Sequence, residues 1–156
     1  MKTTTIDKSA WERGPWDDEC DRDSWNDEAT GLPCIIKRHP HSGHWCGYVG
    51  VPAGHPWNGK GYDDCGPDVH GGLTYAEKCD GDPVGGVCHV AAAGEDDAVW
   101  WLGFDCAHAW DYSGMARDAA WRRRFPREPE EVYRDEACIR AEVASLARQV
   151  VEAGAP

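Results

Sequence analysis

Glycine and proline interrupt the chain so often before residue 112 that its apolar residues can form only short segments. The 156 residues include 18 glycines and 10 prolines, gathered in turn-type clusters such as residues 52–61 and 79–86. Long helices are disfavoured there, because glycine is a poor helix former and proline lacks the backbone N–H that a helix needs. Short apolar segments between such turns predict β-strands.

Five segments carry the β-branched and aromatic residues that strands favour: residues 33–38, 45–51, 72–76, 86–92 and 98–105. The first two are expected to form a hairpin, and together the five predict a small antiparallel sheet. Residues 1–30 are acidic, contain Trp11, Trp16 and Trp25, and show no sustained period. We therefore expect an irregular lead-in before the sheet.

The C-terminal segment has a helical period instead. Ile139, Val143, Leu146 and Val150 follow one another at spacings of four, three and four residues, which places them on one face of a helix. Pro129 near the first turn and a glycine at the end predict a helix over residues 129–152. The expected fold is a loop-rich α+β domain spanning residues 1–156, with this amphipathic helix packed on one face of the sheet.

Charge and cysteine content limit the possible partners. The net charge is −12, and residues 61–111 hold eleven acidic residues against one basic residue. Such a field repels phosphate backbones and argues against nucleic acid as a partner. The N-terminus has no apolar signal region and no stretch is long enough for a membrane span, which predicts a cytoplasmic protein. The eight cysteines are then expected to be thiols or metal ligands rather than disulfides.

A cluster of imidazoles and carboxylates is the main candidate site. It comprises Asp68, His70, Asp105, His108 and Asp111, placed around the expected strand ends. Histidine nitrogen with carboxylate oxygen suits a divalent metal such as Zn or Mn, which could activate water for hydrolysis. The same side chains could also perform acid/base chemistry without a metal. The alternative is structural, with both histidines simply hydrogen-bonded to neighbouring carboxylates.

Cysteines offer two further hypotheses. Cys106 with His108 could be a nucleophile and its base, although an acidic setting disfavours a thiolate, and a buried structural cysteine is the simpler interpretation. A structural zinc is a separate hypothesis, although its ligand spacings match no standard motif. Its candidate ligands are Cys79, Cys88 and His89, together with His39, His41, His44 and Cys46 upstream.

The glycine-rich loop over residues 51–67 is the remaining feature. His55, Trp57, Lys60 and Tyr62 combine aromatic surface, a cation and hydrogen-bond donors. This is a composition suited to a lid over a planar, nucleotide-like ligand. An Ω-loop whose aromatic residues fill the edge of the core is the alternative.

Three stretches, GHWCGYVGVPAGHPWNGKGYDD, VHGGLTYA and WWLGFDCAHAWD, followed by YRDEACIRAEVASLARQ, carry a resemblance over about residues 30–150. In them the chain resembles a family of small uncharacterised proteins found in phages and bacteria. The resemblance implies a compact intracellular protein, located in the host cytoplasm if a phage encodes it. It supplies no catalytic residues to transfer to this chain.

Two classes of function follow from the candidate site. One is a hydrolase, metal-dependent or acid/base, acting on a small polar substrate, for which a nucleotide-like molecule is one candidate. The other is a non-catalytic protein that sequesters a small ligand or binds a host protein as an antagonist of host defence. A third, weaker interpretation makes the acidic surface a mimic of nucleic acid. The sequence does not determine the oligomeric state.

Overall fold

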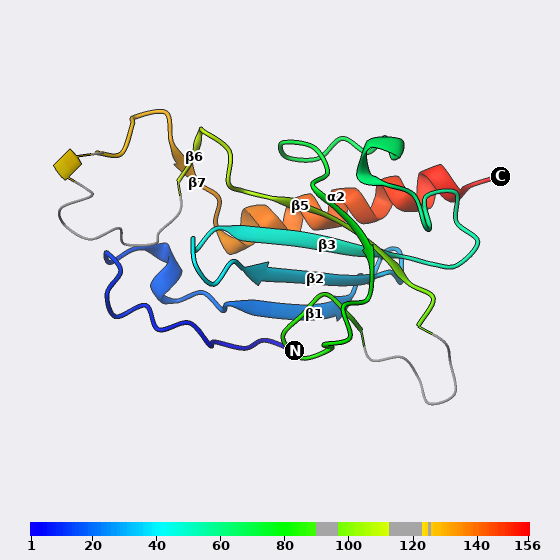
Figure 1. Ribbon diagram of the computed structural model, residues 1–156, viewed down its shortest axis with the longest axis horizontal. Helices are drawn as coiled ribbons and strands as arrows, with labels where there is room; N and C mark the ends of the chain where they lie inside the picture. Colours follow the sequence, from blue (N-terminus) through cyan, green and yellow to red (C-terminus); the bar gives the residue numbers. More distant parts are fainter. Residues whose placement is uncertain (90–96, 113–122, 125) are drawn as a thin grey trace.

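The computed structural model describes residues 1–89, 97–112, 123–124 and 126–156. A five-stranded antiparallel sheet carries one long helix, α2, on one face (Figure 1). The strands are β1 (Arg22–Asn26), β2 (Pro33–Arg38), β3 (Trp45–Val51), β4 (Tyr75–Lys78) and β5 (Trp100–Asp105), in the order β1-β2-β3-β5-β4. Helix α2 covers Glu136–Gly154. The predicted α+β class, the β2–β3 hairpin and the C-terminal helix are confirmed.

The main core lies between α2 and the sheet, where the helix crosses β3 and β2. The predicted helical stripe is fully buried: Ile139, Val143, Leu146 and Val150 are each at most 1% exposed. It packs on alternate residues of the central strands, among them Val49 of β3. Gly47 leaves room for this packing, because a Cβ there would lie 2.6 Å from the Phe104 ring and 2.7 Å from Val143.

The opposite face of the sheet has a smaller core. Ile35, Tyr48 and Trp101 point to this side, as the period-two alternation of strands requires. The loop between β4 and β5 covers them with Val87, which is 4% exposed. The apolar segment 86–89 therefore fills the sheet face instead of forming the predicted strand, and residues 90–92 of that prediction lie outside the described residues.

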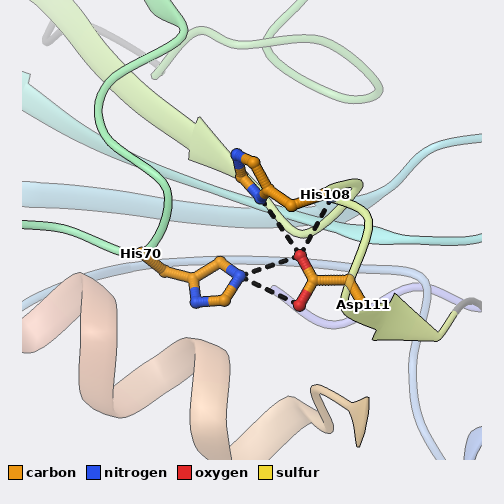
Figure 2. Close-up of side chains that lie close together, drawn as sticks. All are labelled: His70, His108 and Asp111. Carbon is orange, nitrogen blue, oxygen red and sulfur yellow. Dashed lines mark hydrogen bonds and ion pairs between the residues drawn. The ribbon is translucent and has the colours of Figure 1, made fainter. Parts of the chain in front are cut away.

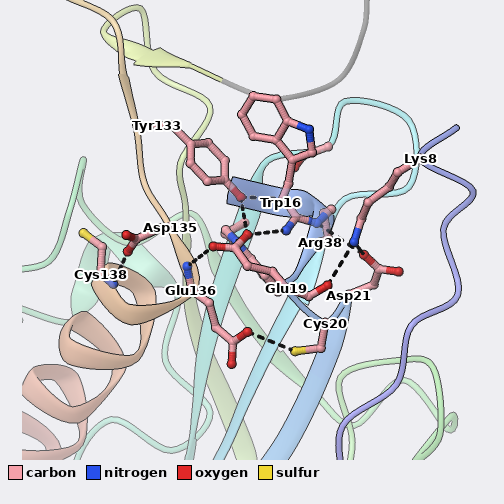
Figure 3. A network of polar contacts seen from close by, with 12 residues as sticks. Lys8, Trp16, Glu19, Cys20, Asp21, Arg38, Tyr133, Asp135, Glu136 and Cys138 are labelled. Atoms are coloured by element: carbon pink, nitrogen blue, oxygen red, sulfur yellow. Dashed lines mark hydrogen bonds and ion pairs between the residues drawn. The ribbon is translucent and has the colours of Figure 1, made fainter. Parts of the chain in front are cut away.

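A hydrogen-bonded network around Glu19 holds the start of α2 (Figure 3). One carboxylate oxygen of Glu19 accepts from the Arg38 guanidinium at 2.8 Å and from the Tyr133 hydroxyl at 2.5 Å. The other accepts from the backbone N–H of Glu136 at 2.8 Å, in the first turn of α2. Because the Arg38 side chain is fully buried against Trp45, its charge needs this partner.

Short elements complete the frame. They are the 3-10 turns η1 (Pro15–Asp17) and η2 (Tyr62–Asp64), and the parallel two-residue strands β6 (Asp111–Tyr112) and β7 (Val132–Tyr133). Strand β7 leads into α2. None of the helices in the described part of the chain has the length and apolar character of a membrane span.

The predicted strand over residues 72–76 is displaced, since β4 covers Tyr75–Lys78. Two other predicted boundaries were wrong for identifiable reasons. The helix begins at Glu136 rather than near residue 129, because Asp135 caps it by accepting from the Cys138 N–H at 2.8 Å. The lead-in over residues 1–30 is not wholly irregular, since β1 lies inside it and pairs with β2. Its polar sequence hid this strand, because an edge strand needs no continuous apolar pattern.

Truncating the helix stripe should destabilise the whole domain. Leu146→Ala removes a fully buried side chain between α2 and the sheet, so we expect the free energy of unfolding to fall by about 2–5 kcal/mol. Urea denaturation monitored by circular dichroism measures this change. The matched control is Arg148→Ala on the exposed side of the same helix, expected to change stability by about 0.5 kcal/mol or less. Equal losses in both variants would contradict the packing described.

Candidate functional site

Asp111 is the centre of a compact group of polar side chains (Figure 2). Its carboxylate is fully buried, and both oxygens contact His70 Nε2, at 2.8 and 3.0 Å. His108 contacts the same carboxylate twice, through its backbone N–H and through Nδ1, each at 3.1 Å. Arg134 Nε adds a further donor at 3.2 Å. Four groups from three separate parts of the chain therefore hold one aspartate.

The turn after β5 places Asp111 and His108 together. Cys106 N–H still bonds to Trp45 of β3 at 2.9 Å, which extends the sheet by one residue. The chain then turns back, with the Asp111 N–H donating to the His108 carbonyl at 2.9 Å. The His108 ring stacks on Trp110, with ring centroids 5.3 Å apart. This tight turn brings a histidine onto the aspartate three residues later.

His70 reaches the group from the loop before β4. Its backbone N–H donates to the Glu142 carboxylate of α2 at 2.6 Å, which ties the loop to the helix. Gly71 follows with φ of +67°, a conformation that favours glycine. A Cβ at Gly71 would overlap the His108 ring. The glycine after His70 is thus needed for the close approach of the two histidines, whose ring centroids are 5.3 Å apart.

Hydrogen bonding keeps Asp111 ionised. Burial acts to raise the pKa of the Asp111 carboxyl, but the hydrogen bonds from His70 and His108 outweigh burial and lower this pKa below its usual value. An ionised carboxylate only accepts hydrogen bonds. The His70 nitrogen that faces it, Nε2, is therefore assigned as the donor, and in the neutral imidazole Nδ1 is the nitrogen that can accept a proton.

A cleft of about 380 Å³ opens beside this group, between the His70 loop and the first half of α2. Its walls are Asp68, Val69, His70, Cys106, Arg134, Cys138, Ile139, Glu142 and Ser145. The volume lies in the range of small-molecule sites. His70 belongs to both the cleft wall and the Asp111 group, so an imidazole oriented by a buried carboxylate faces a space that can admit a small ligand.

The predicted site residues are only partly brought together. Nitrogen and oxygen atoms of His70, His108 and Asp111 lie within 4.8 Å of one another, as metal ligands would. Asp68 and Asp105 are not in this ligand group. Asp68 lines the cleft, and its backbone is paired with the side chain of Gln149. Asp105 instead accepts from the Ala107 N–H at 3.0 Å, at the start of the turn.

Cys106 lies in the cleft wall but is poorly suited to act as a nucleophile. It is 3% exposed, and burial followed by the charge of Asp111 raises the pKa of its thiol strongly. A thiol in such a setting stays protonated and unreactive. These observations favour the structural interpretation of this cysteine.

The loop proposed as a lid lies elsewhere. His55 Nε2 is 2.7 Å from the carbonyl of Val150, near the C-terminal end of α2, whereas the cleft is beside the first half of this helix. Trp57 packs against the main core. The backbone carbonyl of Lys60 accepts from the Trp100 indole, and Tyr62 is 46% exposed. None of the four lines the cleft, and their arrangement matches an anchored loop.

Sequence reasoning missed the helix side of the cleft. Cys138, Glu142 and Ser145 line it, and each stands one residue before a member of the buried stripe. Their own spacing of four and three residues continues to Gln149, which binds the Asp68 backbone. A polar row next to an apolar stripe was the available signal. No sequence pattern marked Arg134 as a site residue, because its position depends on the pairing of β7, which it follows.

The cysteine prediction needs one correction. Cys79 and Cys88 form a disulfide, whereas all eight cysteines were expected to be thiols or metal ligands. The other six are free. Of the proposed zinc ligands, only Cys79 and Cys88 appear in a ligand group, and Asp97 joins them there. His39 and His44 stack on each other instead, with centroids 5.0 Å apart.

Comparison with protein-family models, curated proteins and solved structures gives no match for this chain. The resemblance to a phage and bacterial family therefore remains a prediction, and the function has to be argued from the site itself.

Replacing the buried carboxylate should have a pH-dependent cost. Asp111→Asn weakens several charge-assisted hydrogen bonds, so we expect the free energy of unfolding at pH 7 to fall by about 1–3 kcal/mol. The pKa of Asp111 is lowered in the folded protein. The ionised carboxylate therefore makes its full contribution to the free energy of unfolding above the pKa of an unfolded aspartate, about 3.9. This contribution is lost as the pH falls through the folded-state pKa. The difference between wild type and variant should therefore shrink below about pH 4.

Urea denaturation at a series of pH values checks this prediction. Asp63→Asn, at an exposed position in η2, is the matched control and should give little difference at any pH. A cost for Asp111→Asn that stays constant into acid would show that the charge of the carboxylate is not what stabilises this group.

Proposed function

We propose that this protein is a hydrolase in which His70, oriented by Asp111, acts as a general base on a small polar substrate bound in the cleft. The observation that carries the proposal is the contact of both Asp111 oxygens with His70 Nε2, at 2.8 and 3.0 Å, beside a cleft of about 380 Å³. A buried carboxylate that fixes the tautomer and orientation of a histidine is a recurring part of acid/base sites.

The chemistry follows from the protonation states. Nδ1 of His70 takes a proton from water as the water attacks an ester-, amide- or phosphate-type centre. The resulting imidazolium is stabilised by the buried negative charge of Asp111 at hydrogen-bond distance. His70 then returns the proton to the leaving group. His108 acts as a positioning residue, because it binds Asp111 and does not line the cleft. Arg134 also binds Asp111, and it lines the cleft as well.

Several polar groups of the cleft support a small polar substrate. Arg134 offers a cation at one wall, while Asp68 and Glu142 offer carboxylates at the others. Such a mixed lining suits a ligand that carries both hydrogen-bond donors and an anionic group, as a nucleotide-like molecule does. Cys138, whose residue is exposed, also lines the cleft and supplies an alternative nucleophile to water.

A metal-dependent form of the same reaction is the second candidate, favoured by the ligand geometry of His70, His108 and Asp111. Ligands of a tetrahedral zinc at about 2.0–2.1 Å stand roughly 3.4 Å apart, so these groups would have to open slightly from their contacts of 2.8–3.1 Å. Arg134 places a cation 3.2 Å from Asp111 Oδ1, which opposes a second cation there. The metal-free mechanism therefore fits the residues better.

The test is a hydrolysis screen of the purified protein with p-nitrophenyl acetate, p-nitrophenyl phosphate, bis(p-nitrophenyl) phosphate and nucleoside triphosphates. We expect turnover of at least one class, and a loss of about 10²–10⁴-fold in kcat/KM for His70→Ala. His41→Ala, in an exposed loop, is the matched control and should keep full activity. Circular dichroism confirms that each variant is folded.

Two further arms separate the alternatives. Activity that survives a chelator supports the acid/base mechanism, whereas activity lost to a chelator and restored by Zn²⁺ or Mn²⁺ supports the metal-dependent form. Cys138→Ser distinguishes attack by a thiol from attack by water. Absence of turnover throughout, or full activity in His70→Ala, would reject the hydrolase and leave ligand sequestration or binding to a host protein as the function of the cleft.

A further inference from the structure

A second group of metal-ligand side chains lies on the opposite face of the sheet from α2. The sulfur atoms of Cys79 and Cys88 and a carboxylate oxygen of Asp97 all lie within 4.8 Å of one another. His89 is beside them, with Nδ1 3.3 Å from Asp97 Oδ1. Two sulfurs, an imidazole and a carboxylate form a four-ligand set that zinc accepts.

While the disulfide is formed, the polar atoms of this group lack good hydrogen-bond partners. Asp97 Oδ1 and His89 Nδ1 are both buried without a hydrogen bond of good geometry. Asp97 Oδ2 lies 3.3 Å from the sulfur of Cys88, and a disulfide sulfur has no proton to donate. Buried polar atoms are nearly always paired. Their convergence on two cysteines indicates a ligand, since a cation at this point would satisfy all of them together.

The loop that carries the cysteines is held in shape without the disulfide. Asp80 and Val87 are joined by two hydrogen bonds, one from each backbone N–H, at 3.3 and 2.8 Å. Arg22 donates to the carbonyl of Gly86, and Lys37 donates to that of Gly85 at 2.9 Å. Val87 is anchored in the core of the second sheet face. After reduction the two sulfurs therefore stay close together.

We propose that Cys79, Cys88, His89 and Asp97 bind one zinc ion when the Cys79–Cys88 disulfide is reduced. A dithiol reductant transfers two electrons and two protons to the disulfide, becomes a cyclic disulfide itself and leaves two cysteine thiols. Zn²⁺ then displaces both thiol protons to solvent as it binds the thiolates. Thiolates on a tetrahedral zinc stand about 3.8 Å apart, a separation that rotation of the two side chains provides. A two-electron oxidant such as diamide, which is reduced to its hydrazine as it takes up two protons, re-forms the disulfide from the two thiolates and releases the ion.

Cobalt titration under anaerobic conditions tests the site directly, because thiolate ligands give Co²⁺ a charge-transfer band that nitrogen and oxygen ligands do not. We expect dithiothreitol-reduced protein, freed of reductant, to bind one Co²⁺ with this band, and added Zn²⁺ to abolish it. Protein oxidised with diamide should show no band. In Cys79→Ser the band should weaken and the affinity fall at least a hundredfold, and in His89→Ala the affinity should fall at least tenfold.

Three controls make the result decisive. Cys65→Ser removes a free cysteine outside the group and should leave the band unchanged. The His70→Ala, His108→Ala double variant should also keep it, which separates this site from the cleft. Circular dichroism of the reduced protein reports the fold. Absence of the band in reduced wild type, a band of undiminished intensity and affinity in Cys79→Ser, or loss of structure on reduction would overturn the proposal.

Discussion

The packing of one helix face across two central strands determines where the cleft lies. Helix α2 buries its stripe on β2 and β3, and Val143 and Leu146 are fully inaccessible. A residue one position before a buried one lies about 100° around the helix, at the border between the core and solvent. Cys138, Glu142 and Ser145 occupy such positions. The cleft therefore follows from the packing, because its helix wall is the border of the core.

Burial of Asp111 is the second constraint, and it links stability to function. A buried carboxylate is costly unless several donors meet it, and here His70, His108 and Arg134 supply them. These residues come from the loop before β4, the turn after β5 and the segment that follows β7. One carboxylate thus fixes three connections at the same end of the sheet. The arrangement also immobilises the His70 ring, which a general base requires.

The elements that the sequence predicted correctly are those that a local residue pattern is enough to determine. The short segments at β2 and β3, rich in β-branched and aromatic residues, and the apolar stripe of α2 could be read from the sequence because each is buried in the core. Grouping His70 with Asp111 was also possible from their positions at expected strand ends. The start of α2 was not, because it depends on the cap at Asp135 and on Glu19, which is 117 residues away from its partner Glu136. Strand β1 is polar because its charges have specific partners, such as Asp23 with Arg140.

The two candidate sites share β5, and the alternation of its side chains keeps them apart. Trp101 points to the face where His89 lies, with ring centroids 6.2 Å apart, whereas Leu102 and Phe104 lie under α2. The strand then runs on into the turn that holds His108. A metal bound at the cysteines would act on β5 through Trp101, while the strand is fixed on both sides by β3 and β4. Because both neighbouring strands hold β5 in place, binding of a metal would stabilise the strand more readily than it would move it. Metal binding at the cysteines should therefore stabilise β5 without rearranging the end of the sheet that carries Asp111.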